Sequence, residues 1–394
     1  RAAGQGEYWF GEKASAISTA AARAIRSTPG AIATAGIVLT LVAGGLYAQN
    51  EPRYSYQENL PEGNAAYAAI QKIDDRLGGS NFVRVMIQFP KGHKLQSAET
   101  LAIIARAHAI LEAEPAFHAI TSLHSAERWM KSGGQTRGDV FHFLDKAKSP
   151  LSSRLTSKEN NSALLTAQLP LIESDQLIPV LDSLEKKLDA LAAANPGVEF
   201  FVTGLTPLSA RASTEMIGKL NQSLALAIGV IIVLIGLALR STVYGLVSIA
   251  PNLLPIAAGG TFLYLNGHGL QFTSVVAFTV AFGIAVDSTI HVLNRYRLAR
   301  RKTRDVNAAI SETLAAIGPV LIVATIVLIA GIGVTIISEL PMVRLYGQIS
   351  SVVLVTAFLG AMVFLPAILS MADKWMMAHV DTPRRKAPTK AKAR

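Results

Sequence analysis

Residues 222–239 read QSLALAIGVIIVLIGLAL, a run of 18 positions without a charged side chain. A helix needs about 20 apolar residues to cross the ~30 Å hydrocarbon core of a bilayer, so this run predicts a membrane-spanning helix. Outward from it, the chain contains five more runs of similar length and hydropathy. The six predicted spans are residues 31–48, 222–239, 243–265, 272–293, 315–338 and 345–370. The sequence therefore predicts an α-helical polytopic membrane protein with six transmembrane helices.

The composition agrees with a membrane protein. Of the 394 residues, 51% are hydrophobic and 16% are charged, whereas soluble domains have about 25% charged residues. The chain has no cysteine, which excludes a disulfide framework, a thiolate metal site and a cysteine nucleophile. Thirty residues precede the first run, so we interpret it as a span and not as a secretory signal.

The distribution of Lys and Arg predicts how the spans are oriented. With the N-terminus in the cytoplasm, the cytoplasmic segments collect 18 Lys and Arg residues, and the short loops on the other side hold only Arg344. Cytoplasmic loops are enriched in Lys and Arg. Both termini are therefore expected on the cytoplasmic side of the membrane, which we expect to be the bacterial inner membrane. Residues 49–221, with 18 basic and 19 acidic residues, then lie outside. The net charge of +10 is accordingly a topology and lipid-headgroup signal, and no nucleic-acid partner is expected.

The outer segment predicts an inserted α/β domain of β-α-β type. A β-branched and aromatic run at residues 82–89 (FVRVMIQF) indicates a strand. Two strand-helix-strand cycles follow from the same patterns: 82–89, 97–113 and 118–123, then 162–169, 174–194 and 198–202. Residues 124–161 between them are expected to be loops with short helices. The phenylalanines of this domain, which either line an apolar route or form its core, are Phe82, Phe89, Phe117, Phe141, Phe143, Phe200 and Phe201.

These patterns divide the chain into consecutive parts. We expect a cytoplasmic leader or linker (1–30), a first span (31–48), a periplasmic domain (49–221), a bundle of five spans (222–372) and a basic cytoplasmic tail (373–394). Within the bundle, residues 294–312 are expected to form a basic helix along the inner membrane surface, where Lys and Arg contact anionic headgroups.

Asp287 is the only carboxylate within the six predicted spans. It lies eight residues before Arg295, about 12 Å along a helix, and a charge at the bilayer centre costs at least about 2.5 kcal/mol. Asp287 must therefore be paired, protonated or in contact with water, which makes it a candidate proton carrier. The alternative is a structural pair with His291 or with a cytoplasmic arginine. His291 is in turn a candidate relay group, or a polar residue in contact with headgroups.

Further candidates share or adjoin this helix. Gly283, Asp287 and His291 are spaced i, i+4, i+8 on one helix face, and Ser288 is adjacent. Thr325 in the fifth span could hydrogen-bond toward the carboxylate or satisfy its own backbone. The remaining candidates are structural or hinge positions that break a helix or allow close packing: Pro251, Asn252, Pro255, Gly318 and Gly331.

The ordered motifs resemble the resistance-nodulation-division (RND) transporter superfamily, in its MMPL and hopanoid-exporter-like branch. They are Thr203-Gly204, Pro251-Asn-Leu-Leu-Pro255, Gly283 to Asp287, His291, Arg295-Tyr-Arg297, Thr313 with Gly318, Gly331, Ser338-Glu-Leu-Pro341, Gly347 and Pro366. The resemblance implies that this chain is the C-terminal six-helix half of a transporter, that the outer segment is a porter domain, and that Asp287 occupies the proton-carrying position. Where the family often has a second acid or a tyrosine, this chain has Ser288.

The resemblance further implies proton-driven antiport that exports lipids or other hydrophobic compounds, of hopanoid or sterol-like type, toward the periplasm or outer membrane. The implied partners are the substrate, membrane lipids, the other six-helix half, periplasmic accessory proteins and further copies in a homo-oligomer. No enzyme activity, metal or cofactor is expected, and the lack of a GxxxxGK[ST] phosphate loop leaves the proton gradient as the energy source. The alternative is a non-transporting sterol-sensing or accessory protein of the same fold.

Overall fold

The computed structural model describes residues 4–54, 60–61, 63–95, 97–136, 154–157, 159 and 161–380. The chain divides into two compact units, each treated separately below. The helical unit comprises residues 1–50, 220–338 and 343–394, and the α/β unit comprises residues 51–219 and 339–342. Phe141, Phe143 and the predicted tail beyond residue 380 lie outside the described residues.

The described residues contain six helical segments that are long and apolar enough to cross a membrane, which confirms the six predicted spans. The segments are Pro29–Tyr47, Leu205–Ala238, Thr242–Leu265, Phe272–Lys302, Val306–Ile337 and Pro341–Met377. Most extend past the predicted ends because polar residues at the bilayer boundary continue the helix. Large apolar side chains such as Leu226 and Val327 are more than 60% exposed, as expected of helices that face lipid.

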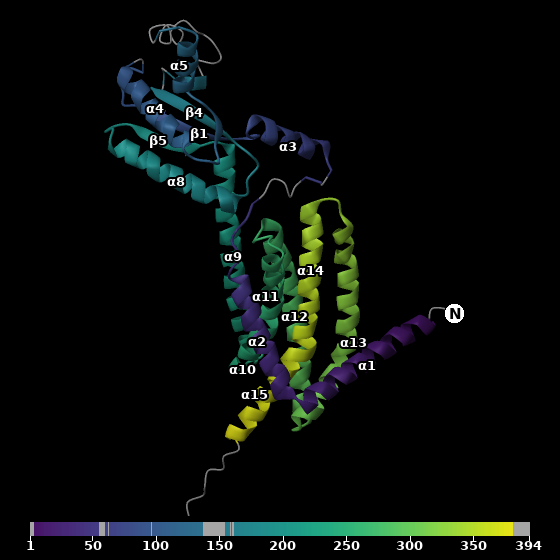
Figure 1. The fold of residues 1–394 in the computed structure, drawn as a ribbon. Helices are drawn as coiled ribbons and strands as arrows, with labels where there is room; N and C mark the ends of the chain where they lie inside the picture. The colour runs from purple at the N-terminus through teal and green to yellow at the C-terminus, as the bar shows by residue number, and fades with distance from the viewer. Residues whose placement is uncertain are drawn as a thin grey trace, which may run out of the picture. The chain divides into compact units, whose positions relative to one another are not determined.

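The helical unit is built from helices that follow one another closely along the chain, except between residues 50 and 220, where the α/β unit intervenes in the sequence (Figure 1). They are α1 (Gly4–Ser27), α2 (Pro29–Tyr47), α9 (Leu205–Ala238, from residue 220), α10 (Thr242–Val247), α11 (Ile249–Leu265), α12 (Phe272–Lys302), α13 (Val306–Gly333), the 3₁₀ turn η2 (Val334–Ile337), α14 (Pro341–Leu359, from residue 343), the π-helical η3 (Gly360–Phe364) and α15 (Leu365–Val380). Glycines on α11 allow close packing: a Cβ at Gly260 would overlap the ring of Tyr47, and a Cβ at Gly259 would press on Phe278.

Residues 4–27, expected only as a leader, form the helix α1. Its buried positions Ala14, Ser18, Ala22 and Ile25 are small or apolar and follow helical spacing. This stripe packs α1 against α13, and Gly318 on α13 leaves the space that Ser18 occupies.

The separate basic helix expected over residues 294–312 is wrong. Residues 294–302 complete α12, and α13 begins at Val306. Thr303 adopts an extended backbone that ends α12, and the Asp305 carboxylate caps α13 by accepting a hydrogen bond from the Asn307 N–H at 2.9 Å. The basic residues Arg300 to Lys302 instead occupy the last turn of α12, where positive charge offsets the helix dipole.

The α/β unit contains the strands and helices of the two predicted cycles. It also has a helix at residues 65–77 that the sequence patterns do not predict, and a short strand at residues 156–157, where loops and short helices are expected. The elements in chain order are α3 (Ala65–Leu77), β1 (Asn81–Gln88), α4 (Ala98–Glu112), β2 (His118–Thr121), α5 (Leu123–Ser132), β3 (Thr156–Ser157), β4 (Ser162–Leu169), α8 (Ser174–Ala193) and β5 (Glu199–Thr203). The sheet order is β2-β4-β1-β5, every pairing is antiparallel, and β3 pairs with β4. This order is the split β-α-β arrangement, in which a strand of the second cycle lies between the two strands of the first.

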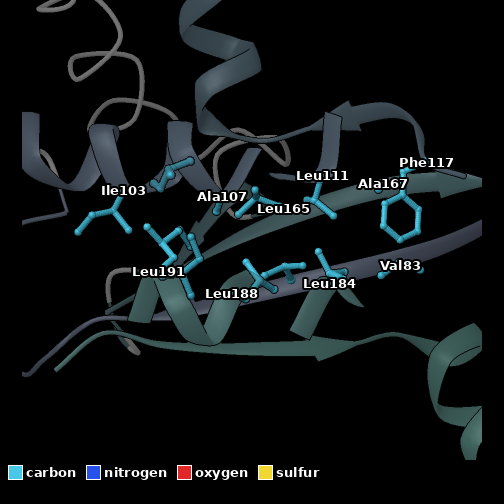
Figure 2. Close-up of a cluster of buried hydrophobic side chains, with 14 of the residues drawn as sticks. Val83, Ile103, Ala107, Leu111, Phe117, Leu165, Ala167, Leu184, Leu188 and Leu191 are labelled. Carbon is cyan, nitrogen blue, oxygen red and sulfur yellow. The ribbon is translucent and has the colours of Figure 1, made fainter. Parts of the chain in front are cut away.

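One face of the sheet forms the core of the α/β unit. Residues 83, 85 and 87 of β1 are buried and alternate with more exposed positions, as a two-faced strand requires. Figure 2 shows leucines of α8 and apolar residues of α4 directed at β1 and β4. Phe89 and Phe117 belong to this core, whereas Phe82 and Phe201 are 40% and 44% exposed. The described phenylalanines therefore do not line one continuous apolar route.

Candidate intramembrane ion-pair site

Asp287 and His291 lie next to each other on α12, close enough to form an ion pair when the histidine is protonated. His291 Nε2 lies 3.4 Å from Asp287 Oδ1, and the two side chains are 64% and 73% exposed in this chain. The two residues occupy positions i and i+4, which lie on the same helix face. This contact is the structural alternative expected from the sequence, and proton transfer by Asp287 stays a prediction.

The pair lies on the face of α12 that the rest of the helical unit leaves bare. Val286, Thr289 and Val292 are buried against neighbouring helices. Gly283 lies on the exposed side, and a Cβ added there would meet no atom within 4 Å. A charged or strongly polar pair in direct contact with hydrocarbon is costly. This face therefore needs a polar or protein covering in the membrane.

The other two predicted relay residues are not brought to the pair. Ser288 Oγ donates a hydrogen bond to the Ile284 carbonyl at 3.0 Å, so its hydroxyl satisfies its own helix backbone. Thr325 is half-buried on α13, and within the described part of the chain no hydrogen bond joins it to Asp287. Of the four residues, the structure brings only Asp287 and His291 together.

Behind the pair, a buried hydrogen bond holds α12 to α11. Thr289 Oγ1 donates to Asn252 Oδ1 at 2.8 Å, and both residues are at most 1% exposed. Asn252, which the sequence predicts to break the span, lies inside the continuous helix α11 and links it to α12. The amide nitrogen of Asn252 has no partner among the described residues, so this contact leaves one buried polar group unsatisfied.

The predicted hinge positions have different surroundings. Pro255 lacks an N–H and cannot bond the Pro251 carbonyl one turn before it. That carbonyl lies close to Gly360 in the π-helical turn η3, where an added Cβ would be 2.8 Å from the Pro251 oxygen. The missing hydrogen bond of α11 and the π turn are therefore neighbours in the helical unit. Gly318 packs against α1, as described above, whereas Gly331 is exposed with open space around its Cα.

Sequence patterns do not reveal a buried charge cluster at one end of α12. Asp373 on α15 is 8% exposed, accepts a hydrogen bond from Tyr296 Oη at 2.6 Å and pairs with Arg300 Nε at 2.5 Å. Its predicted place in the tail is wrong, because hydropathy marks the end of the apolar run at residue 370 while the helix continues. The available signal is the i, i+4 spacing of Tyr296 and Arg300, which places a donor pair on one face of α12.

A second polar cluster lies in the α/β unit. Ser122 Oγ accepts two backbone N–H groups at the start of α5, so its hydrogen is directed to His108 Nδ1 at 2.8 Å. His108 Nε2 then donates to Glu112 Oε1 at 3.1 Å. Burial lowers the pKa of His108, and a hydrogen bond from Arg128 lowers the pKa of Glu112. Ser122 is fully buried, so this arrangement is structural and offers no accessible nucleophile.

The fold and the site define a six-span membrane protein with a large α/β insertion after the first span and an ion pair on the fourth. The sequence model of the MMPL family matches residues 58–392. The chain belongs to the MMPL family, within the RND superfamily.

Two relatives show the range of the likeness. A membrane protein of Methanocaldococcus jannaschii, MJ1562, is 20% identical over 352 residues, which cover 86% of this chain and 90% of that protein. Multidrug resistance protein MdtC of Shigella flexneri is 30% identical over 167 residues, which cover 41% of this chain and 16% of MdtC. The match to MdtC thus spans less than one fifth of that protein's length.

Proposed function

We propose that the chain is one six-helix unit of a proton-driven exporter of lipids or other hydrophobic compounds. In this proposal it lies in the bacterial inner membrane with both termini cytoplasmic and with the α/β unit as a periplasmic porter domain. The excess of Lys and Arg in alternate loops supports this orientation. Membership of the MMPL family supports transport as the activity. The direction of transport and the hydrophobic substrate class rest on the resemblance alone.

The observation that carries the proposal is the ion pair of Asp287 and His291 on an uncovered face of a membrane-spanning helix. Contact with lipid would be unfavourable, so we expect a second six-helix unit to cover this face. In MJ1562 the matched region is 90% of the protein, so one six-helix unit is nearly the whole of that chain. This supports a second copy, as well as another half of a longer chain, as the covering partner.

The pair also gives a way to couple proton binding to a structural change in the transporter. When Asp287 takes up a proton it loses its negative charge and its attraction to His291. The charge on the covered face then changes with each proton bound and released, and the second unit would be the structure that responds. The buried bond from Thr289 to Asn252 holds the opposite face of α12 to α11, so the change is directed to the covered side.

The test is substrate-dependent proton flux in proteoliposomes that contain the complete transporter. Asp287→Asn keeps the side-chain size but removes the titrating group, and we expect it to abolish flux while substrate binding is retained. Asp75→Asn, at an exposed position of the α/β unit, is the matched control and should leave flux unchanged. Unchanged flux in Asp287→Asn would overturn the proposed role. Absence of flux in the native protein would favour the sensing or accessory alternative.

A further inference from the structure

A pocket opens among α2, α9 and α11, entirely within the helical unit. Its volume is about 370 Å³, within the range of roughly 300–1,000 Å³ that is typical of small-molecule sites. Its wall is formed mainly by apolar side chains, including Leu224, Ile228 and Ile256, which are less than 10% exposed. The lining contains no Asp, Glu, Lys, Arg or His.

Three polar side chains interrupt this apolar lining. The Thr40 hydroxyl donates to the Gly36 carbonyl of its own helix at 2.8 Å, and the other two, Tyr47 and Asn221, form a pair. Tyr47 at the end of α2 donates its hydroxyl hydrogen to Asn221 Oδ1 on α9. The Tyr47 ring is held in place because it lies against the backbone of Gly260 and because its centroid is 5.9 Å from that of Phe278. Packing of the Tyr47 ring therefore holds the pair in a fixed position at the pocket.

The pair can still bind a ligand group. The tyrosine oxygen keeps lone pairs that accept hydrogen bonds, and the asparagine amide carries two N–H donors. Among the described residues no hydrogen bond occupies the amide nitrogen of Asn221. A hydroxyl group both donates and accepts and matches this pair, and a carbonyl matches the amide donors. A charged headgroup would find no counter-ion in the lining.

We propose that this pocket binds an uncharged lipid that carries a hydroxyl or carbonyl head, with the head at Tyr47 and Asn221 and the hydrocarbon body against α9 and α11. The inference rests on the proposed function and narrows its substrate class from hydrophobic compounds to uncharged lipids with a single polar head. The three helices that line the pocket are expected to lie in the bilayer, so such a lipid can enter from the membrane without crossing water.

The structure provides a way to fill the pocket. Gly44 lines it, and a Cβ built at Gly44 meets no atom within 4 Å. Gly44→Leu therefore extends into the open space without disturbing the helix backbone. Gly45, the next residue, is equally unobstructed but does not line the pocket, so Gly45→Leu is a matched control for the added bulk and for the loss of a glycine.

The probe is a long-chain alcohol with a diazirine in its chain, compared with the carboxylic acid of the same chain at a pH where the acid is ionised. The purified full chain in lipid nanodiscs is photolabelled without a proton gradient, and the labelled peptides are identified by mass spectrometry. We expect the alcohol to label peptides of α2, α9 and α11. Gly44→Leu should reduce this labelling about tenfold, since overpacking a filled site costs about 1–3 kcal/mol.

Tyr47→Phe removes the acceptor but keeps the ring. We expect it to weaken alcohol labelling about threefold to tenfold, the effect of one net hydrogen bond, and to leave labelling by a hydrocarbon probe of the same length unchanged. Equal labelling of native protein and Gly44→Leu, or equal labelling by alcohol and carboxylate, would show binding of bulk lipid chains only and would overturn the inference. Size-exclusion elution shows whether each variant is folded.

The binding test is separable from the test of function. If labelling fails but Asp287→Asn still abolishes proton flux, the pocket assignment is wrong and the exporter proposal stands. If labelling behaves as expected but flux is insensitive to Asp287→Asn, the pocket is a lipid site in a protein that does not use Asp287 for coupling.

Discussion

The buried cluster of Asp373, Arg300 and Tyr296 joins α12 to α15 through side chains and should be a main source of stability for this part of the helical unit. The side chains of Asp373 and Arg300 are only 11% and 16% exposed, and removing one partner of a buried ion pair costs about 3–5 kcal/mol because the other charge is left uncompensated. We expect Asp373→Asn to lower the free energy of unfolding by about 3 kcal/mol. Tyr296→Phe removes one hydrogen bond to a charged group and should cost about 1.5–3 kcal/mol.

The cluster has a convenient reporter two residues away. Trp375 is on α15, and the chain has only two other tryptophans, Trp9 and Trp129. In a Trp9→Phe, Trp129→Phe background, denaturant unfolding in mixed detergent micelles can be followed by fluorescence near the cluster. A double-mutant cycle with Asp373→Asn and Arg300→Gln isolates the pair, and we expect a coupling energy of about 2 kcal/mol.

Small and additive effects would contradict a stabilising interaction between Asp373 and Arg300. If each single variant changed the free energy of unfolding by less than about 0.5 kcal/mol and the two effects were additive, the pair would behave as an exposed ion pair. The cluster would then contribute nothing to the stability of the helical unit.

Two further predictions concern α1 and the α/β unit. Gly318→Leu should displace α1 from α13, because the new side chain overlaps Ser18, and should increase proteolysis of residues 4–27, whereas Gly331→Leu, with open space around it, should not. The lowered pKa of His108 means that the folded state favours neutral histidine, so its stability is full above about pH 6.5 and falls as the pH decreases toward the folded pKa, by at most about 1.4 kcal/mol per pH unit. Burial also lowers the pKa of the neighbouring His124, which contributes a slope of the same sign. Thermal unfolding should therefore show a smaller slope in His108→Gln and an unchanged slope in His118→Gln, and an unchanged slope in His108→Gln would assign it to another group.

Hydropathy and strand patterns are sufficient to predict the spans and the two strand-helix-strand cycles of the α/β unit, because both depend on local composition, but they do not indicate α3. Packing of α1 cannot be predicted in the same way. Its buried stripe consists largely of Ala and Ser, which have no strong hydrophobic signal, and its partner Gly318 lies in a distant part of the chain. Only the three-dimensional structure brings the two together.

The surroundings of the two carboxylates Asp287 and Asp373 also could not be predicted from sequence patterns alone. The predicted pairing of Asp287 and His291 follows from helical spacing, but α12 is apolar on most sides, so the sequence does not indicate which face its neighbours cover. Hydropathy places Asp373 in the tail because a charge after an apolar run normally marks the membrane interface. Its burial depends on Tyr296 and Arg300 from another helix, which hydropathy along the chain cannot show.

The proposed function depends most on a second six-helix unit that covers the face of α12 carrying Asp287. Because the chain has no cysteine, a nitroxide can be attached at Gly283→Cys alone, and at Val327→Cys on the exposed side of α13 as a lipid-facing control. The measurement is the collision rate of each label with oxygen, by electron paramagnetic resonance, in the reconstituted transporter assembly. A rate at residue 283 several-fold below that at residue 327 is the result we predict, and equal rates would show that lipid covers the Asp287 face and would contradict the account.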